Sequence, residues 1–94
     1  MNRNRIGSIV AIILLGSIAG QAVASPTCTR QPESQWLSET EMQKKISQMG
    51  YKEIKVFKKT TSGCYEIYGR TADGRKAEVY FNPVTGAVVE SNVD

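Results

Sequence analysis

The sequence predicts an α+β fold in which one N-terminal helix packs on an antiparallel sheet of three or four strands. Three observations lead to this class. Apolar residues recur at helical spacing between Ser38 and Gly50. They alternate with a strand-like period after Gly50. The breaks between the later apolar runs are short, which favours antiparallel neighbours. The expected order is αβββ with a short final strand.

The expected helix has a well-defined start and end. Ser38 followed by Glu41 is a capping box, and Gly50 should end the helix in a left-handed conformation. One apolar stripe indicates the buried face: Met42, Ile46 and Met49. The two thioethers of this stripe could also suggest metal or haem ligation, but residues at helical spacing are more typical of core packing.

Three alternating runs predict half-buried strands: Ile54–Lys59, Tyr65–Thr71 and Ala77–Phe81. A two-residue Asp-Gly turn between the last two would split their apolar residues across both faces. A three-residue loop, residues 72–74, instead places Ile67 opposite Val79 on one face. We therefore expect this loop, with Gly74 in the left-handed position of a glycine bulge.

The stretch Asn-Pro-Val-Thr-Gly, residues 82–86, is interpreted as a structural corner. Pro83 presets a turn, and Gly86 supplies a positive φ before Ala87–Val89 begins a short return strand. Thr85 has no histidine or lysine at a spacing that would make it a nucleophile. The predicted structural turn residues are Gly50, Gly74, Pro83 and Gly86.

Strand alternation also assigns the face that points away from the helix. Ile54 and Val56 are expected to point inward, and the residues expected to point outward are Phe57, Glu66, Tyr68, Arg70, Lys76, Glu78 and Tyr80. The aromatic residues of this set, Phe57, Tyr68 and Tyr80, form the candidate partner-binding face. The alternative is that these rings pack across strands, or lie under the irregular arm that precedes the helix.

The first residues have the pattern of a signal peptide, residues 1–24. Arg3 and Arg5 precede the apolar run Ile9–Leu15, and small residues before Ser25 predict cleavage after Ala24. A membrane anchor is the alternative, but the run is far shorter than the roughly 20 residues of a spanning helix. We expect a periplasmic or secreted protein without stable membrane insertion, with an irregular arm at 25–35 and one domain at 36–94.

Two cysteines, Cys28 and Cys64, predict one structural disulfide in an exported chain. A redox-active pair is the alternative, although such pairs usually lie close together in the sequence. The formal net charge of +3 falls close to neutral once Arg3 and Arg5 leave with the signal peptide, so we expect no nucleic-acid partner. The chain has no histidine and no clustered carboxylates, so we expect no enzyme, metal site or cofactor.

Two motifs carry a resemblance to a known family. The pieces are "GCYEIYG", residues 63–69, and "VYFNPVTGAVV", residues 79–89, and they follow a capped helix and a Gly-Tyr pair. In this order the chain resembles the PepSY domains found in propeptides of some secreted metallopeptidases, over about Trp36 to Glu90. The resemblance implies a helix packed on an antiparallel sheet, and it carries over no catalytic residues.

The leading functional interpretation is a small, exported, non-enzymatic protein-binding module. The resemblance implies that its partner is another protein, and it extends to inhibition or regulation of a periplasmic or secreted peptidase. The alternative is a periplasmic sensory or small-ligand-binding accessory protein of a membrane system.

Overall fold

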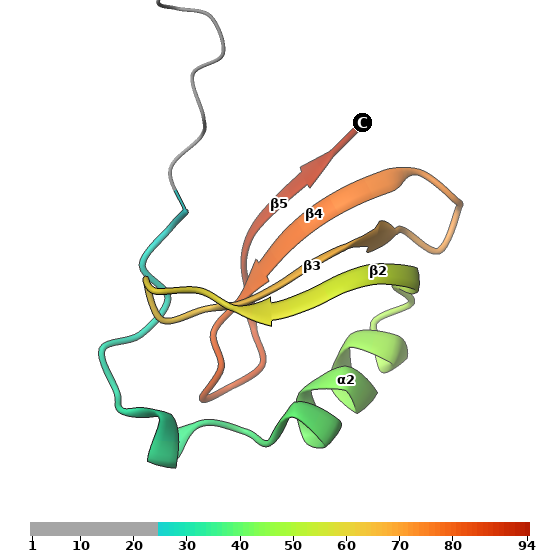
Figure 1. Ribbon diagram of the computed structural model, residues 1–94. Coiled ribbons are helices and arrows are strands. Elements are labelled where there is room, and N and C mark those ends of the chain that lie inside the picture. Colours follow the sequence, from blue (N-terminus) through green and yellow to red (C-terminus); the bar gives the residue numbers. More distant parts are fainter. Residues whose placement is uncertain (1–24) are drawn as a thin grey trace, which may run out of the picture.

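The computed structural model describes residues 25–94 and contains one α-helix packed on a four-stranded antiparallel sheet (Figure 1). The elements in chain order are a short 3-10 helix η2 (Glu33–Gln35), α2 (Glu39–Gln48), β2 (Lys52–Lys59), β3 (Tyr65–Arg70), β4 (Lys76–Phe81) and β5 (Val88–Val93). The sheet order is β2-β3-β4-β5. The α+β class is confirmed. The expected signal peptide, residues 1–24, lies outside the described residues.

Helix α2 starts and stops at the predicted residues, and only the place of Met49 differs from the prediction. Ser38 and Glu41 form the capping box, and Gly50 has φ 96°. Met42 and Ile46 are buried in the core. The prediction for Met49 is wrong: the helix ends at Gln48, so Met49 is the C-cap residue, and it is 43% exposed.

The aromatic ring of Tyr51 covers the end of the core that Met49 leaves uncovered. Tyr51 packs edge-on against Phe81, with ring centroids 6.0 Å apart. The core between the helix and the sheet consists of Met42, Ile46, Tyr65, Ile67, Ala77, Val79 and Phe81, with Trp36, Leu37, Tyr51 and Phe57 packed against it.

The hairpin between β3 and β4 has the predicted register. Ile67 lies opposite Val79, and the Thr71 N–H donates to the Arg75 carbonyl at 2.8 Å across a three-residue loop. Gly74 in this loop has φ 92°. The register places the apolar residues of both strands on the helix side.

The predicted orientation of β2 is wrong at its second half. Val56 pairs with the outward-facing Tyr68, and Phe57 pairs with the inward-facing Ile67. The cause is an irregularity in the pairing between Lys52 and Val56, where Glu53 has φ 49°. Between these two pairs β2 has three residues and β3 has one. Strict alternation from Ile54 therefore does not predict which face Phe57 takes.

As a result, the Phe57 ring lies on the side of the sheet that faces the helix. It stacks on Tyr65 with ring centroids 5.1 Å apart and packs against the core. Ile54 and Val56, expected to be inside, are exposed.

The turn after β4 is a corner closed by its own side chain. The Asn82 Oδ1 atom accepts hydrogen bonds from the Val84 and Thr85 N–H groups, and the Gly86 N–H donates to the Asn82 carbonyl at 2.7 Å. Gly86 has φ 82°. Strand β5 then runs to Val93, so the final strand is as long as its neighbours rather than short.

A disulfide fixes the N-terminal arm to the hairpin between β2 and β3. Cys28 and Cys64 are bonded, and the Cys28 N–H donates to the Ser62 carbonyl at 3.2 Å. The Asn82 Nδ2 group donates to the Cys28 carbonyl at 3.2 Å. The arm is therefore held at two places. At the β2–β3 hairpin it has the disulfide and one hydrogen bond, and after β4 it has the hydrogen bond from Asn82.

Candidate functional site: the sheet face opposite the helix

Helix α2 lies on one face of the sheet, and the opposite face carries no second layer from residues 25–94 (Figure 1). We call this opposite surface the outer face. The strand register arranges its side chains in rows across the sheet. One row is Lys58, Glu66, Tyr80 and Glu90, and the next is Val56, Tyr68, Glu78 and Asn92. Antiparallel neighbours in such rows are within contact distance of one another.

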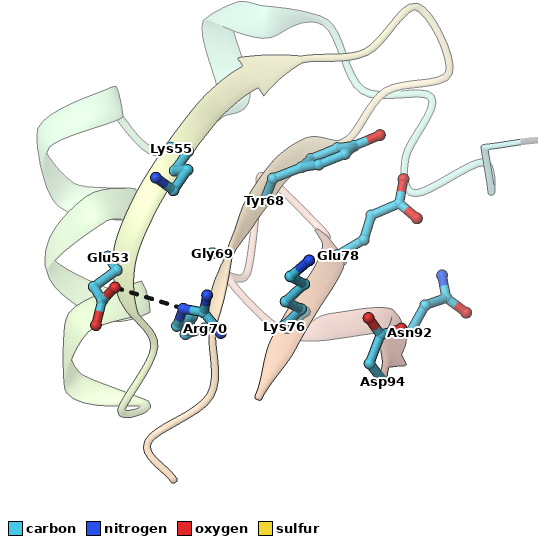
Figure 2. A pocket seen from close by; sticks show the side chains of 10 residues that line it. Glu53, Lys55, Tyr68, Gly69, Arg70, Lys76, Glu78, Asn92 and Asp94 are labelled. Atoms are coloured by element: carbon cyan, nitrogen blue, oxygen red, sulfur yellow. Dashed lines mark ion pairs between the residues drawn. The ribbon is translucent and has the colours of Figure 1, made fainter. Parts of the chain in front are cut away.

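A groove of about 310 Å³ lies on the outer face, over the end of β3 and the start of β4 (Figure 2). Its lining includes Glu53, Lys55, Tyr68, Arg70, Lys76 and Glu78, and β5 contributes Asn92. Acidic and basic side chains alternate around it, and the Arg70 Nε and Glu53 Oε1 atoms form an ion pair at 3.5 Å. The Tyr68 ring is the large aromatic side chain of the groove.

The three aromatic residues of the predicted binding face have three different environments. Tyr68 is 46% exposed, as expected for a contact residue. Tyr80 points outward but is only 5% exposed, and its hydroxyl donates to the Glu78 Oε2 atom at 2.8 Å. Phe57 lies on the helix side of the sheet. Of the three, only Tyr68 is available for an external contact.

A buried acidic residue, Glu66, is the feature of this face that the sequence analysis did not identify. It was expected to face solvent, but it is 4% exposed. Burial raises the pKa of the Glu66 carboxyl, and a hydrogen bond with Glu78 raises it further. The same hydrogen bond lowers the pKa of Glu78. Of the two carboxyl groups, Glu66 is therefore the one that takes up a proton first as the pH falls.

Two tyrosine hydroxyls and one lysine surround this carboxyl pair. Burial raises the pKa of Tyr80, and its hydrogen bond with Glu78 acts in the same direction. The hydrogen bond with Glu78 also raises the pKa of Tyr68. The Lys58 Nζ atom lies 3.7 Å from Glu66. The predicted register already placed Glu66 and Glu78 on diagonal positions of one face, and this was the signal that could have revealed the pair.

We expect Glu66→Gln to stabilise the protein increasingly as the pH rises. Because the folded pKa of Glu66 is raised, its contribution to stability is present below the ordinary pKa of about 4.3 and is lost as the pH rises through the raised value. A glutamine amide keeps the hydrogen bond to Glu78 and cannot ionise. The free energy of unfolding should rise by roughly 1 kcal/mol at about pH 8.

Thermal unfolding of both proteins from about pH 4 to about pH 8 measures this difference. The two curves should coincide at the acid end and separate at the alkaline end. Glu90→Gln makes the same chemical change in the same row of side chains and should produce no such separation. Parallel curves for Glu66→Gln and the native protein would contradict a raised pKa of Glu66 in the folded protein.

Residues 25–94 thus form a small two-layer α+β module with a helix on one face of its sheet only. The chain belongs to the PepSY family described as the peptidase propeptide and YPEB domain, whose model matches residues 8–92. No curated protein and no solved structure matches the chain. The family that the sequence motifs predicted is confirmed.

Two further properties belong to the described part of the chain, residues 25–94. None of its helices combines the length and the apolar character needed to cross a membrane. Within residues 25–94, no three His, Cys, Asp or Glu side chains come together as a possible metal site.

Proposed function

We propose that this protein is a small, exported, non-catalytic module that binds another protein and thereby inhibits or regulates a periplasmic or secreted peptidase. Membership of a peptidase-propeptide family supports the class of partner. The Cys28–Cys64 disulfide supports an oxidising compartment. The signal-peptide pattern of residues 1–24 supports export to such a compartment.

The exposed Tyr68 ring in the outer-face groove is the observation that carries the proposal. Tyrosine is among the residues that contribute most to protein interfaces, because it buries a large rigid area and keeps a polar end. Tyr68 is held on a central strand, β3, which has a neighbour on each side. Its surroundings provide a rim of both charges, with Arg70 and Glu78 close by (Figure 2). An anchor with a charged rim is the usual composition of a protein-binding patch.

The proposal predicts inhibition that depends on Tyr68. The purified protein should slow casein hydrolysis by exported peptidases of the cell that produces it, and Tyr68→Ala should raise the half-inhibitory concentration about 30-fold. This factor corresponds to roughly 2 kcal/mol, the loss typical of an aromatic interface anchor. Because Tyr68 is exposed, the thermal midpoint should change little.

Met49→Ala is the matched control, because Met49 is a similarly exposed side chain at the end of α2 and outside the groove. This variant should inhibit as the native protein does. Equal inhibition by the native protein and Tyr68→Ala, or no inhibition of any exported peptidase, would contradict the proposal.

The volume of the same groove supports a second candidate, the binding of a small ligand by a sensory or accessory protein. Its 310 Å³ lies at the lower end of the range of about 300–1,000 Å³ for small-molecule sites. A low-molecular-weight fraction of the periplasm should then raise the thermal midpoint of the native protein and leave Tyr68→Ala unchanged. A protein partner predicts no effect of this fraction.

A further inference from the structure

The two edges of the sheet differ in how they are protected against pairing with another strand. Edge strand β2 carries four lysines, Lys52, Lys55, Lys58 and Lys59. It also has the pairing irregularity before Val56. Lysines and bulges are the usual means by which edge strands avoid unwanted partners. Edge strand β5 has neither lysine nor proline, and its own pairing irregularity lies near its start, at Val89. Its exposed apolar residues are Val88, Val89 and Val93.

The backbone of β5 presents hydrogen-bonding groups at this second edge. The Asp94 N–H donates to the Lys76 carbonyl at 3.1 Å, so the backbone N–H of Asp94 points toward β4. In an antiparallel pair such bonds alternate along the strand. The N–H and C=O groups of Ser91 and Val93 therefore point away from β4, and no strand of residues 25–94 lies there to receive them.

We propose that β5 pairs with β5 of a second copy of this chain, in antiparallel orientation, around a two-fold axis at Ser91. In this register Ser91 lies opposite Ser91 of the second copy, and Val89 lies opposite Val93 of the second copy. The Ser91 pair joins outward N–H and C=O groups of both copies, and the outward groups of Val93 meet the backbone of Val89, which has no partner on β4. The same strand supplies both sides of the contact, as a two-fold interface requires.

The side chains of β5 are complementary to themselves in this register. On the outer face Glu90 lies opposite Asn92 of the second copy, so a carboxylate meets an amide. The Asn92 amide already donates to the Glu90 Oε2 atom within the strand at 3.1 Å. On the helix side the exposed valines meet one another. A register centred on Glu90 would instead oppose two like charges, which is destabilising.

A dimer of this kind would join the outer faces of both copies into one continuous sheet. The strand is six residues long, so the contact is small, and a weak, reversible dimer is expected. The proposal is independent of the Tyr68 contact, because it concerns the edge of the sheet rather than its outer face.

Sedimentation equilibrium over a range of concentrations tests the dimer. The native protein should approach the dimer mass as the concentration rises to about 1 mM, the limit for weak association. Ser91→Pro removes an N–H that points away from β4, and it should remain monomeric with its β-sheet circular dichroism retained. Ser91→Ala keeps this N–H and should dimerise as the native protein does. A native protein that stays monomeric at about 1 mM overturns the proposal.

Cysteine cross-linking tests the register and does not depend on the proline variant. Opposed hydrogen-bonded residues have Cα atoms about 5.5 Å apart, within the range of a disulfide. Oxidised Ser91→Cys should therefore run as a covalent dimer, whereas Glu90→Cys should not. Cross-linking of Glu90→Cys alone would overturn the register. A dimer that forms equally well with Ser91→Pro would overturn the β5 edge as its interface, as would capture of a partner peptide there in place of the second copy.

Discussion

Replacing Cys28 with serine and Cys64 with alanine should lower the free energy of unfolding by about 4 kcal/mol. The disulfide links residues separated by 36 positions, so it removes much of the conformational freedom of the unfolded chain. The loss is large for a domain of this size, because small domains have only a few kcal/mol of net stability. Alanine is chosen at position 64 because Cys64 is fully buried, where a hydroxyl would need a partner.

The folded state should lose the attachment of the arm as well as the cross-link. The Cys28 N–H and C=O groups form hydrogen bonds with Ser62 and Asn82. Without the disulfide the arm can detach, and these hydrogen bonds are then lost as well. Urea unfolding of the native protein, with and without reductant, and of the double variant measures the effect. The reduced native protein and the double variant should agree. A difference under about 1 kcal/mol between the oxidised and reduced forms would contradict this account.

Replacing Gly63 with alanine should destabilise the protein by about 3 kcal/mol or more, as expected for a steric clash combined with backbone strain. Gly63 has φ 84°, and a Cβ atom at this position would lie 2.2 Å from the carbonyl oxygen of Thr29. The clashing atom belongs to the backbone of the arm, which the neighbouring disulfide holds against this hairpin. The side chain therefore has no room unless the arm moves.

Gly74→Ala is the matched control, since it isolates the cost of the backbone conformation. Gly74 has φ 92°, and a Cβ atom there would have nothing within 4 Å. This variant should lose only about 1 kcal/mol, the cost of a left-handed alanine. Equal losses for Gly63→Ala and Gly74→Ala in urea unfolding would show that the contact with Thr29 is unimportant.

The two predictions are coupled through the arm. Without the disulfide, the arm can move away from the Cβ atom of an alanine at position 63. The penalty of Gly63→Ala should therefore shrink toward that of Gly74→Ala in the disulfide-free background. A double-mutant cycle measures this coupling. Strict additivity of the two changes would mean that the arm is not held by the disulfide.

Local signals in the sequence determined much of the architecture. A capping box at Ser38 and a glycine at position 50 depend on neighbouring residues alone, and both bounds of α2 follow from them. The β3–β4 register was also predictable, because a buried face and a three-residue loop constrain it from both ends. The disulfide followed from the count of cysteines in a chain with an export pattern.

The orientation of β2 and the environment of Glu66 were decided only by the tertiary structure. Alternation along a strand defines two faces, but the irregular pairing before Val56 interrupts this alternation, and the sequence around Glu53 does not predict it. Pairing with β3 placed Phe57 on the core side and left Tyr68 as the exposed aromatic residue. Strand β5 is longer than predicted because its last residues pair with β4, although residues such as Ser91 and Asn92 have low strand propensity. In each case the deciding contacts join residues distant in the sequence, so no local pattern contains them.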